Sequence, residues 1–114
     1  MTEEHSSITC EKEQHDEIMK WADGVGLPYD HSPMDRPQYQ GNGRADFLFF
    51  LDGKMRWVEQ KFGKGKLTKA QSEWQFKMSS AGNTGLNSWT VAETIAYLRR
   101  EFFPTEINKL KEKE

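Results

Sequence analysis

The dipeptide Asp52-Gly53 constrains the fold most, because it separates two apolar runs. These runs are Phe47–Leu51 and Met55–Val58. Asp-Gly between such runs is among the strongest short-range signals for a β-hairpin with a two-residue type I′ turn. A two-residue turn places Leu51 opposite Lys54, so the residue numbers of every facing pair sum to 105. The sequence therefore predicts an antiparallel hairpin with a fixed register.

The predicted register brings charged side chains together at the open end of the hairpin. Asp46 faces Glu59, and facing residues have Cβ atoms about 4.5–5.5 Å apart. Lys61 leaves the same face of the sheet two residues later. Opposed carboxylates destabilise a sheet, and a divalent cation such as Mg²⁺ would neutralise them. Two interpretations stay open: a metal site suited to phosphodiester hydrolysis, or a solvated strand end with ordinary surface charges.

Five motifs follow one another over roughly residues 11–100. They are E-x-x-Q at Glu11–Gln14, G-x-x-D at Gly43–Asp46, the hairpin, E-x-K at Glu59–Lys61, and a basic glycine-bearing link at Gly63–Leu67 that leads to Gln71 and Trp74. In this order and spacing the chain resembles the virus-type replication-repair nuclease (VRR-NUC) domain of the PD-(D/E)XK nuclease superfamily. Ala45 stands where that family usually has proline.

The resemblance implies a metal-dependent DNA endonuclease that acts in replication, recombination or repair. The stand-alone members of this branch resemble dimeric Holliday-junction resolvases, so DNA and a second copy of the chain are the expected partners. Mg²⁺ or Mn²⁺ is expected on Asp46, Glu59, the backbone carbonyl of Gln60 and Glu11. Lys61 is expected to orient the attacking water and contact the phosphate. The expected catalytic residues are Asp46, Glu59, Lys61, Glu11 and Gln71.

Charge is distributed unevenly along the chain, although the formal net charge is only −2. Residues 1–43 contain nine acidic and three basic residues, whereas residues 44–77 contain eight basic and four acidic residues. The segment around the hairpin is therefore positive, which favours the approach of a phosphate backbone. An ordinary soluble surface gives the same counts. The expected nucleic-acid contacts are Arg44, Lys64, Lys66, Lys69 and Gln14.

A first helix is predicted over residues 10–23, capped by Ser7 or Thr9 and ended by Gly24. Its buried face follows the helical repeat through Ile18, Trp21, Ala22 and Val25. The same face continues backwards to Gln14 and Glu11. These side chains either point towards a polar site inside the protein or end the stripe in a solvated first turn, where acidic residues suit the helix dipole.

A second helix is predicted to start at the capping box formed by Thr68 and Gln71 and to run to about Ala81. Its N-terminus favours anions, and Lys64, Lys66 and Lys69 lie around it. Its buried stripe is predicted at Trp74 and Met78. Gln71 is either a plain capping residue or a member of the active site, and the pattern leaves both open.

The remaining segments complete a small α/β domain. We expect a short strand at 89–91 and a helix from Glu93 to Phe103 that Pro104 ends. Residues 26–43 lack periodicity and are expected to be a functional or disordered loop. The predicted order is α-β-β-α-β-α, a small central mixed sheet with a β-hairpin, flanked by helices, as in a restriction-endonuclease-like core. The chain is one domain over residues 1–114, with a leader at 1–8 and a tail at 105–114.

Composition also indicates the cellular compartment and the kinds of site to expect. There is no apolar run of 18 residues, so no membrane span is expected. The first residues do not resemble a secretory signal, and the single cysteine, Cys10, indicates a reducing cytoplasm. The family resemblance implies that this is the cytoplasm of a bacterial or phage-infected cell. One cysteine and scattered histidines do not predict a zinc site, and neither His15 nor His31 is assigned a role. The rival function is a non-catalytic nucleic-acid-binding or inhibitor module on a nuclease-like scaffold.

Overall fold

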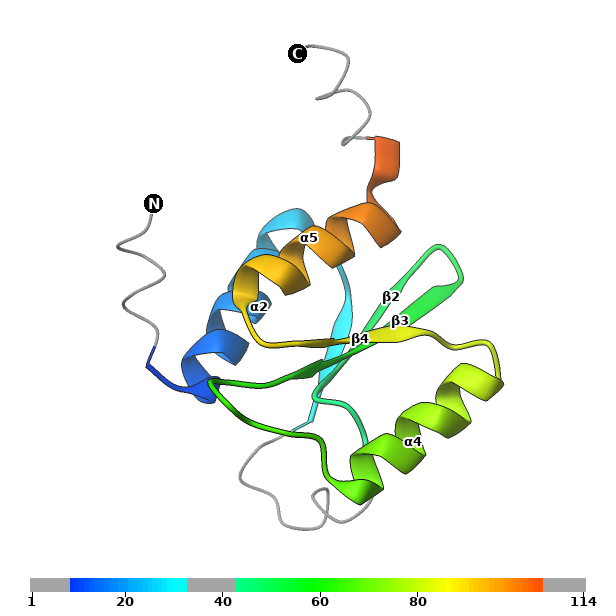
Figure 1. Ribbon diagram of the computed structural model, residues 1–114. Coiled ribbons are helices and arrows are strands. Elements are labelled where there is room, and N and C mark those ends of the chain that lie inside the picture. Colours follow the sequence, from blue (N-terminus) through cyan, green and yellow to red (C-terminus); the bar gives the residue numbers. More distant parts are fainter. Residues whose placement is uncertain (1–8, 33–42, 106–114) are drawn as a thin grey trace.

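A four-stranded mixed sheet between helices forms the part of the chain that the computed structural model describes, residues 9–32 and 43–105 (Figure 1). The elements in chain order are α2 (Glu11–Val25), β1 (Tyr29–His31), β2 (Phe47–Leu51), β3 (Lys54–Gln60), α4 (Lys69–Ser80), β4 (Gly85–Ser88) and α5 (Val91–Phe102). The predicted α/β class, with helices flanking a mixed sheet, is confirmed. The observed order is α-β-β-β-α-β-α, with one strand more than the sequence predicted.

The hairpin has the predicted register. Strands β2 and β3 are antiparallel, and their pairs run from Leu51 opposite Lys54 to Phe47 opposite Val58. Asp52 and Gly53 have φ angles of 53° and 77°, which is the pair of positive values that a type I′ turn requires. The turn therefore fixes which residues meet at the other end of the hairpin.

The two outer strands differ from the prediction. Strand β1 pairs antiparallel with β2, inside a segment that was predicted to be a loop. Strand β4 pairs parallel with β3 and occupies Gly85–Ser88, so the prediction of a strand at 89–91 was wrong. A Cβ on Gly85 would lie 2.0 Å from the Trp57 ring, so only glycine lets this backbone come so close to β3.

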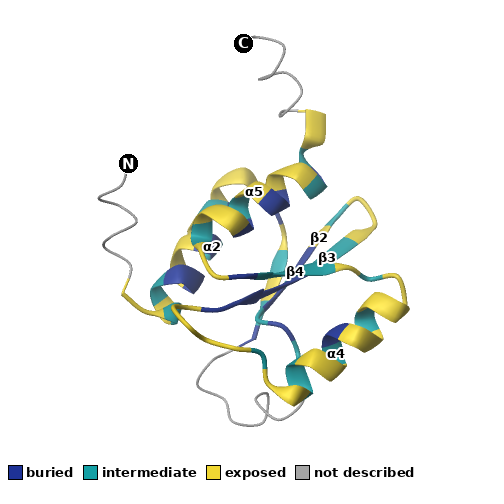
Figure 2. Cartoon of the chain, viewed as in Figure 1, coloured by how far each residue is buried: buried dark blue, intermediate teal, exposed yellow. Residues whose placement is uncertain are grey.

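Helices cover the sheet on both faces (Figure 1). α2 and α5 pack against each other and against β3 and β4, and the core lies between this helical layer and the strands. Buried apolar side chains from both layers form that core: Ile18, Ala22, Leu27, Phe47, Phe49, Val58, Tyr97, Leu98 and Phe102. Figure 2 shows buried residues along the end of β3 away from the hairpin turn, whereas the turn itself is exposed.

Helix α4 covers the opposite face with a thinner contact. Trp74 packs edge-on against Trp57, with ring centroids 5.9 Å apart. Gln75 and Asn87 exchange two side-chain hydrogen bonds of 2.6 and 2.9 Å. Trp74 and Met78 are half-buried as predicted for the inner stripe, but the most buried side chain of this helix is Gln75. α4 is therefore held to the sheet by polar contacts as well as by the pair of tryptophan rings.

The observed helix boundaries differ from the predicted ones at the end of α2 and at the start of α5. α2 continues to Val25 and ends at Gly26, whose φ of 74° is left-handed, rather than at Gly24; Val25 is 44% exposed and is not part of the core. The capping box at Thr68 is confirmed. α5 begins two residues earlier than predicted, with Thr90 as its N-cap.

Some predicted segments fall where the structure describes little or nothing. The leader at 1–8, nearly all of the tail at 105–114 and positions 33–42 of the predicted loop lie outside the described residues. None of the helices in the described ranges is long and apolar enough to cross a membrane.

Candidate active site

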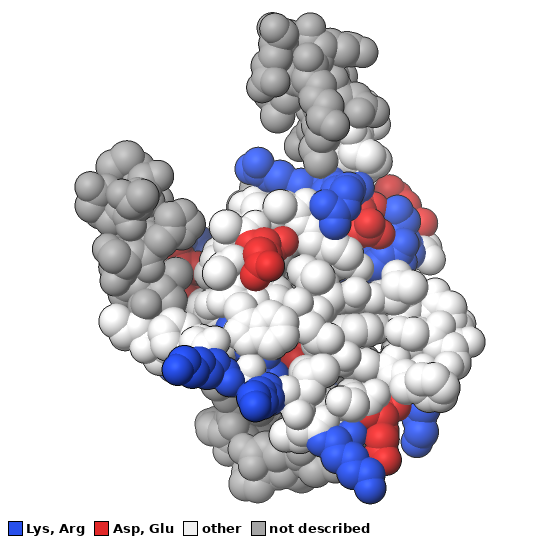
Figure 3. Space-filling view, in the orientation of Figure 1, with Lys and Arg blue, Asp and Glu red and all other residues white. Residues whose placement is uncertain are grey.

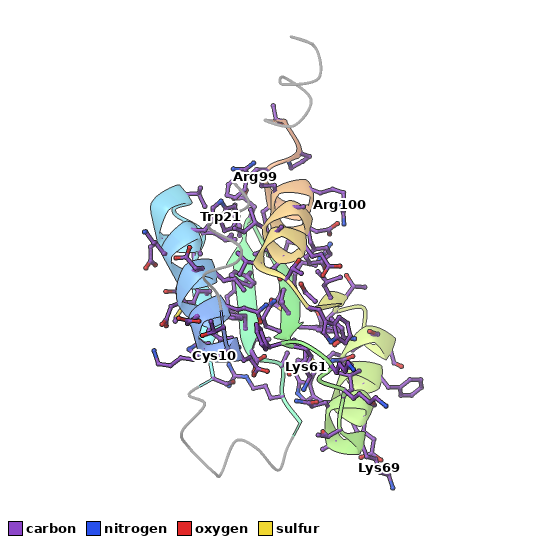
Figure 4. The ribbon with its side chains drawn as sticks, turned by 60° about the vertical axis from the view of Figure 1, so that its left-hand side comes forward. Cys10, Trp21, Lys61, Lys69, Arg99 and Arg100 are labelled. Atoms are coloured by element: carbon purple, nitrogen blue, oxygen red, sulfur yellow. The ribbon has the colours of Figure 1, made fainter. Side chains whose placement is uncertain are left out.

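Four elements meet at one end of the sheet. They are the N-terminus of α2, the residues just before β2, the end of β3 and the N-terminus of α4. In Figure 4, Cys10 at the start of α2 and Lys61 after β3 lie towards the same end, while Trp21, Arg99 and Arg100 lie at the opposite end. This convergence brings together five side chains that the sequence selected: Glu11, Asp46, Glu59, Lys61 and Gln71.

Asp46 immediately precedes Phe47, the last residue of β2 that pairs with β3, where Phe47 lies opposite Val58. Its Oδ2 accepts a 2.9 Å hydrogen bond from the backbone N–H of Gln60. The same oxygen lies 3.5 Å from His15 Nε2 on α2. The carboxylate is therefore tied to the end of β3 on one side and faces α2 on the other.

Glu59 is almost completely buried, with 1% of its surface exposed. Its Oε2 accepts a 3.0 Å hydrogen bond from Gln71 Nε2, but its buried Oε1 receives none from any described residue. Burial and, to a smaller extent, the negative charge of Asp46 raise the pKa of Glu59 to about 8, against the opposing effect of Lys61. A raised pKa at one carboxyl is what two opposed acids predict. The pair therefore needs either a shared proton or a bound cation.

Lys61 is held in a polar network rather than in solvent. Its Nζ donates to Gln71 Oε1 at 3.0 Å and lies 3.5 Å from Glu59 Oε2, and only 9% of the residue is exposed. Gln71 Oε1 also accepts from the backbone N–H of Thr68 at 2.8 Å. Gln71 is thus both a capping residue and a contact of the acid–lysine pair, so the two interpretations of the sequence are compatible.

Gln60 points away from this network, as alternation along β3 requires. Thr94 Oγ1 on α5 donates to Gln60 Oε1 at 2.5 Å. The side chain of Gln60 is completely buried, so any contribution of this residue to the site must come from its backbone. The binding of a metal ion by the backbone carbonyl of Gln60 stays a prediction.

Gly43 explains how the segment before Asp46 reaches the site. Its φ is 72°, and a Cβ there would lie 2.1 Å from Ala70 O and 2.7 Å from Gln71 N. Only glycine lets this backbone pass against the first turn of α4. The G-x-x-D spacing therefore joins the start of β2 to the helix that supplies Gln71.

Glu11 and His15 occupy the side of the site formed by α2. One ligand atom from each of Glu11, His15 and Asp46 lies within 4.8 Å of the others. Burial raises the pKa of the Glu11 carboxyl, as does the charge of Asp46. Such a group of two carboxylates and an imidazole can bind a divalent metal ion.

His15 has no predicted role from the sequence, yet only 1% of it is exposed. Its Nδ1 lies 2.8 Å from Nε2 of His31, and its Nε2 is 3.8 Å from Glu11 Oε2. The signal in the sequence was its position four residues after Glu11, which places both on one helix face. The spacing alone does not reveal the contact between His15 and Asp46, because that contact depends on the tertiary fold.

Gln14 does not lie where a nucleic-acid contact would. Only 3% of the residue is exposed, and its Nε2 donates to Trp89 O at 3.0 Å. This burial argues against the predicted contact. Gln14 instead ties α2 to the segment that follows β4.

The basic residues form a smaller cluster than their count suggested. Arg44 pairs with Asp30, and Arg56 pairs with Glu101 at 2.7 Å. Lys64 and Lys66 are exposed in the link after the site, and Lys69 is exposed at the start of α4. Figure 3 shows the basic side chains on that face as separate groups rather than one continuous stripe. The positive surface near the site therefore depends chiefly on the link and the start of α4.

Comparison with known proteins adds no relative: no family model, no curated protein and no solved structure matches this chain.

Proposed function

We propose that this chain is a metal-dependent endonuclease that hydrolyses DNA phosphodiester bonds. The observation that carries the proposal is the buried Glu59 beside Asp46, with Glu59 Oε1 receiving no hydrogen bond from the described chain. Burying one carboxylate beside another that is only partly exposed costs free energy unless the pair is neutralised. Such a pair is expected where a protein binds a divalent cation at the point of reaction.

The residues present fit Mg²⁺ or Mn²⁺. Glu11 on α2 and Asp46 before β2 offer carboxylate oxygens and belong to the group whose ligand atoms lie within 4.8 Å of one another. Glu59 lies outside that group but close enough for the charge of Asp46 to raise its pKa, and it offers a further carboxylate oxygen. Hard divalent cations prefer oxygen ligands of this kind. When bound, such an ion polarises a phosphate oxygen and makes a coordinated water more acidic.

Lys61 suits a role at the phosphate. Its ammonium is held near the buried acid by Gln71, so it is a fixed cation with rotatable donors beside the reacting position. It would stabilise negative charge on the phosphate and orient the attacking water. Gln71 positions both Lys61 and Glu59 and is not required to touch substrate.

The resemblance supports the same assignment. It implies the order helix, hairpin, E-x-K strand, basic link and Gln-bearing helix, and these elements surround the site. We therefore also propose that the fold is a PD-(D/E)XK restriction-endonuclease-like core. Exposed Lys64 and Lys66, just beyond Lys61, would contact the DNA backbone, and a homodimer would present two such sites.

The direct test is cleavage of branched, flapped, nicked and linear DNA in the presence of Mg²⁺, Mn²⁺ or EDTA. The wild type should cut at least one of these substrates only with a divalent ion. Asp46→Asn, Glu59→Gln and Lys61→Met should each abolish cutting and keep the circular dichroism spectrum. Asp52→Asn is the control, because Asp52 is an exposed acid in the hairpin turn and asparagine accepts its left-handed backbone.

Two results would contradict the proposal. Full activity in any of the three site variants would remove that residue from the mechanism. Salt-sensitive DNA binding without cleavage under any metal condition would instead favour the non-catalytic nucleic-acid-binding module.

A further inference from the structure

One ring nitrogen of His15, Nε2, faces the acids of the site without a hydrogen-bond partner among the described residues. Its Nε2 lies 3.5 Å from Asp46 Oδ2 and 3.8 Å from Glu11 Oε2, which is longer than a normal hydrogen bond. This atom is also buried. A buried nitrogen left unpaired between two carboxylates costs free energy. We therefore expect a further group to bind Nε2.

His31 fixes the orientation of the His15 ring. Nδ1 of His15 lies 2.8 Å from Nε2 of His31, and the two rings meet edge-on at an angle of 79°. His31 in turn lies against Phe47, with centroids 4.7 Å apart. When neutral His15 carries its proton on Nδ1 and donates it to His31, the lone pair of Nε2 points towards Glu11 and Asp46. This is how a second residue usually orients a histidine that binds metal.

We propose that His15 Nε2 is a metal ligand and that the site therefore selects a transition-metal ion such as Mn²⁺ over Mg²⁺. Mg²⁺ is bound chiefly by oxygen atoms, whereas imidazole nitrogen favours first-row transition metals. Glu11, His15 and Asp46 together offer a mixed nitrogen and oxygen donor set. His31 is a positioning residue for this set. The inference deepens the proposed function by naming the ion that the site prefers.

A different role for His15 makes the opposite prediction. If His15 were a protonated counter-charge to Glu11 and Asp46, it would compete with any metal for these acids. Replacing it would then raise metal affinity. If it is a ligand, replacing it lowers metal affinity, so the sign of the change separates the two roles.

The first experiment measures binding without DNA. The full chain is stripped with EDTA and titrated with Mn²⁺, with free Mn²⁺ followed by electron paramagnetic resonance, and Mg²⁺ affinity is obtained by competition. His15→Gln should weaken Mn²⁺ binding on the order of 10- to 100-fold and change Mg²⁺ binding much less. His31→Phe keeps an aromatic ring against Phe47 and should weaken Mn²⁺ binding about 10-fold. Asp16→Asn is the control, because Asp16 follows His15 in α2 but is exposed and pairs with Lys12.

The second experiment needs no variant to fold. Pulsed electron paramagnetic resonance of Mn²⁺ bound to the wild type should show coupling to a ¹⁴N nucleus. Where His15→Gln folds, it should lose this coupling, and His31→Phe should keep it. Absence of ¹⁴N coupling in the wild type, or unchanged or tighter Mn²⁺ binding in His15→Gln, would overturn the inference.

These outcomes are independent of DNA cleavage. Nitrogen-coupled Mn²⁺ in a protein that cuts no DNA would refute the proposed function and support the metal ligand. Cleavage with no nitrogen coupling would do the reverse.

Discussion

Gln71 donates a hydrogen bond from Nε2 to Oε2 of the buried Glu59 at 3.0 Å. Its other amide atom, Oε1, accepts from Lys61 and from the backbone of Thr68. One amide therefore caps helix α4 and also sets the separation between an acid and a cation. A substitution at Gln71 should therefore affect both the start of α4 and the spacing of Glu59 and Lys61.

Replacing Gln71 by methionine should separate these two roles. The variant keeps the side-chain length and loses the hydrogen bonds, so we expect a loss of about 1 kcal/mol in stability, typical of a helix cap. Cleavage should fall on the order of 10²-fold because Lys61 and Glu59 lose their alignment. Chemical denaturation and a cleavage assay measure the two effects. Ser72→Ala, an exposed change in the same turn, should alter neither; equal activity in both variants would contradict the role of Gln71.

The buried Glu59 should make metal-free stability fall as pH rises. The pKa of Glu59 is about 8 in the folded protein, against 4.5 for an ordinary glutamate. The folded state therefore favours the protonated acid, and the penalty for ionising it grows between pH 4.5 and about pH 8. Glu59→Gln removes this penalty.

The measurement is the difference in unfolding free energy between Glu59→Gln and the wild type, in EDTA, at pH 5 and pH 8. We expect the variant to gain stability relative to the wild type on going to pH 8, by roughly 1.4 kcal/mol for each unit of pKa shift expressed. Taking the difference removes most of the contribution of other titrating groups, such as His31, whose pKa is lowered chiefly by burial. A difference that does not change with pH would show that Glu59 titrates normally.

Gly43 and Gly63 provide a matched pair for the packing of the segment before β2. Both have positive φ, 72° and 61°, but a Cβ on Gly43 would meet Ala70 O at 2.1 Å, whereas one on Gly63 meets no described atom within 4 Å. Alanine at Gly63 should cost roughly 1–2 kcal/mol for the left-handed backbone alone and keep activity.

Alanine at Gly43 should cost a further 1–3 kcal/mol, roughly the cost of overpacking, and displace the turn that carries Gln71. Urea denaturation and cleavage compare the two variants. If Gly43→Ala behaves like Gly63→Ala, the close approach to Ala70 is not important for the site.

The link after the site should carry the electrostatic part of DNA binding. Lys64→Gln with Lys66→Gln should weaken binding and reduce the slope of log K against log salt by about 2, since each phosphate contact contributes roughly 0.9. Arg99→Gln with Arg100→Gln removes the same charge at the opposite end of the molecule (Figure 4). That control should change the slope little. Equal effects of the two double variants would indicate a response to net charge and no local contact.

Local chemistry explains which parts of the fold could be predicted. Asp52-Gly53 fixed the hairpin register as far as Phe47 and Val58 and so brought Asp46 to the end of β3, because both the turn type and the pairing are decided within a few residues. The capping box at Thr68 was equally local. The predicted metal ligands and catalytic roles stay predictions, but the proximity on which they depend is present in the structure.

The missed features depend on distant partners. β1 has three residues, and β4 contains a glycine and little apolar surface, so neither has a pattern that separates it from a loop. Both become strands because β2 and β3 offer them hydrogen bonds. His15 was missed for a similar reason. Its significance appears only when α2 lies beside the residue that precedes β2.

The distribution of the site over α2, the start of β2, the end of β3 and α4 has a consequence for how the protein can be assayed. The proposed Mn²⁺ ligands Glu11 and His15 are far from Asp46 along an unfolded chain, so high-affinity uptake of the ion would require the native packing of α2 against the residues before β2. The amount of bound Mn²⁺ would then measure the fraction of molecules that are folded. Its release on heating should follow the same curve as the loss of helical circular dichroism.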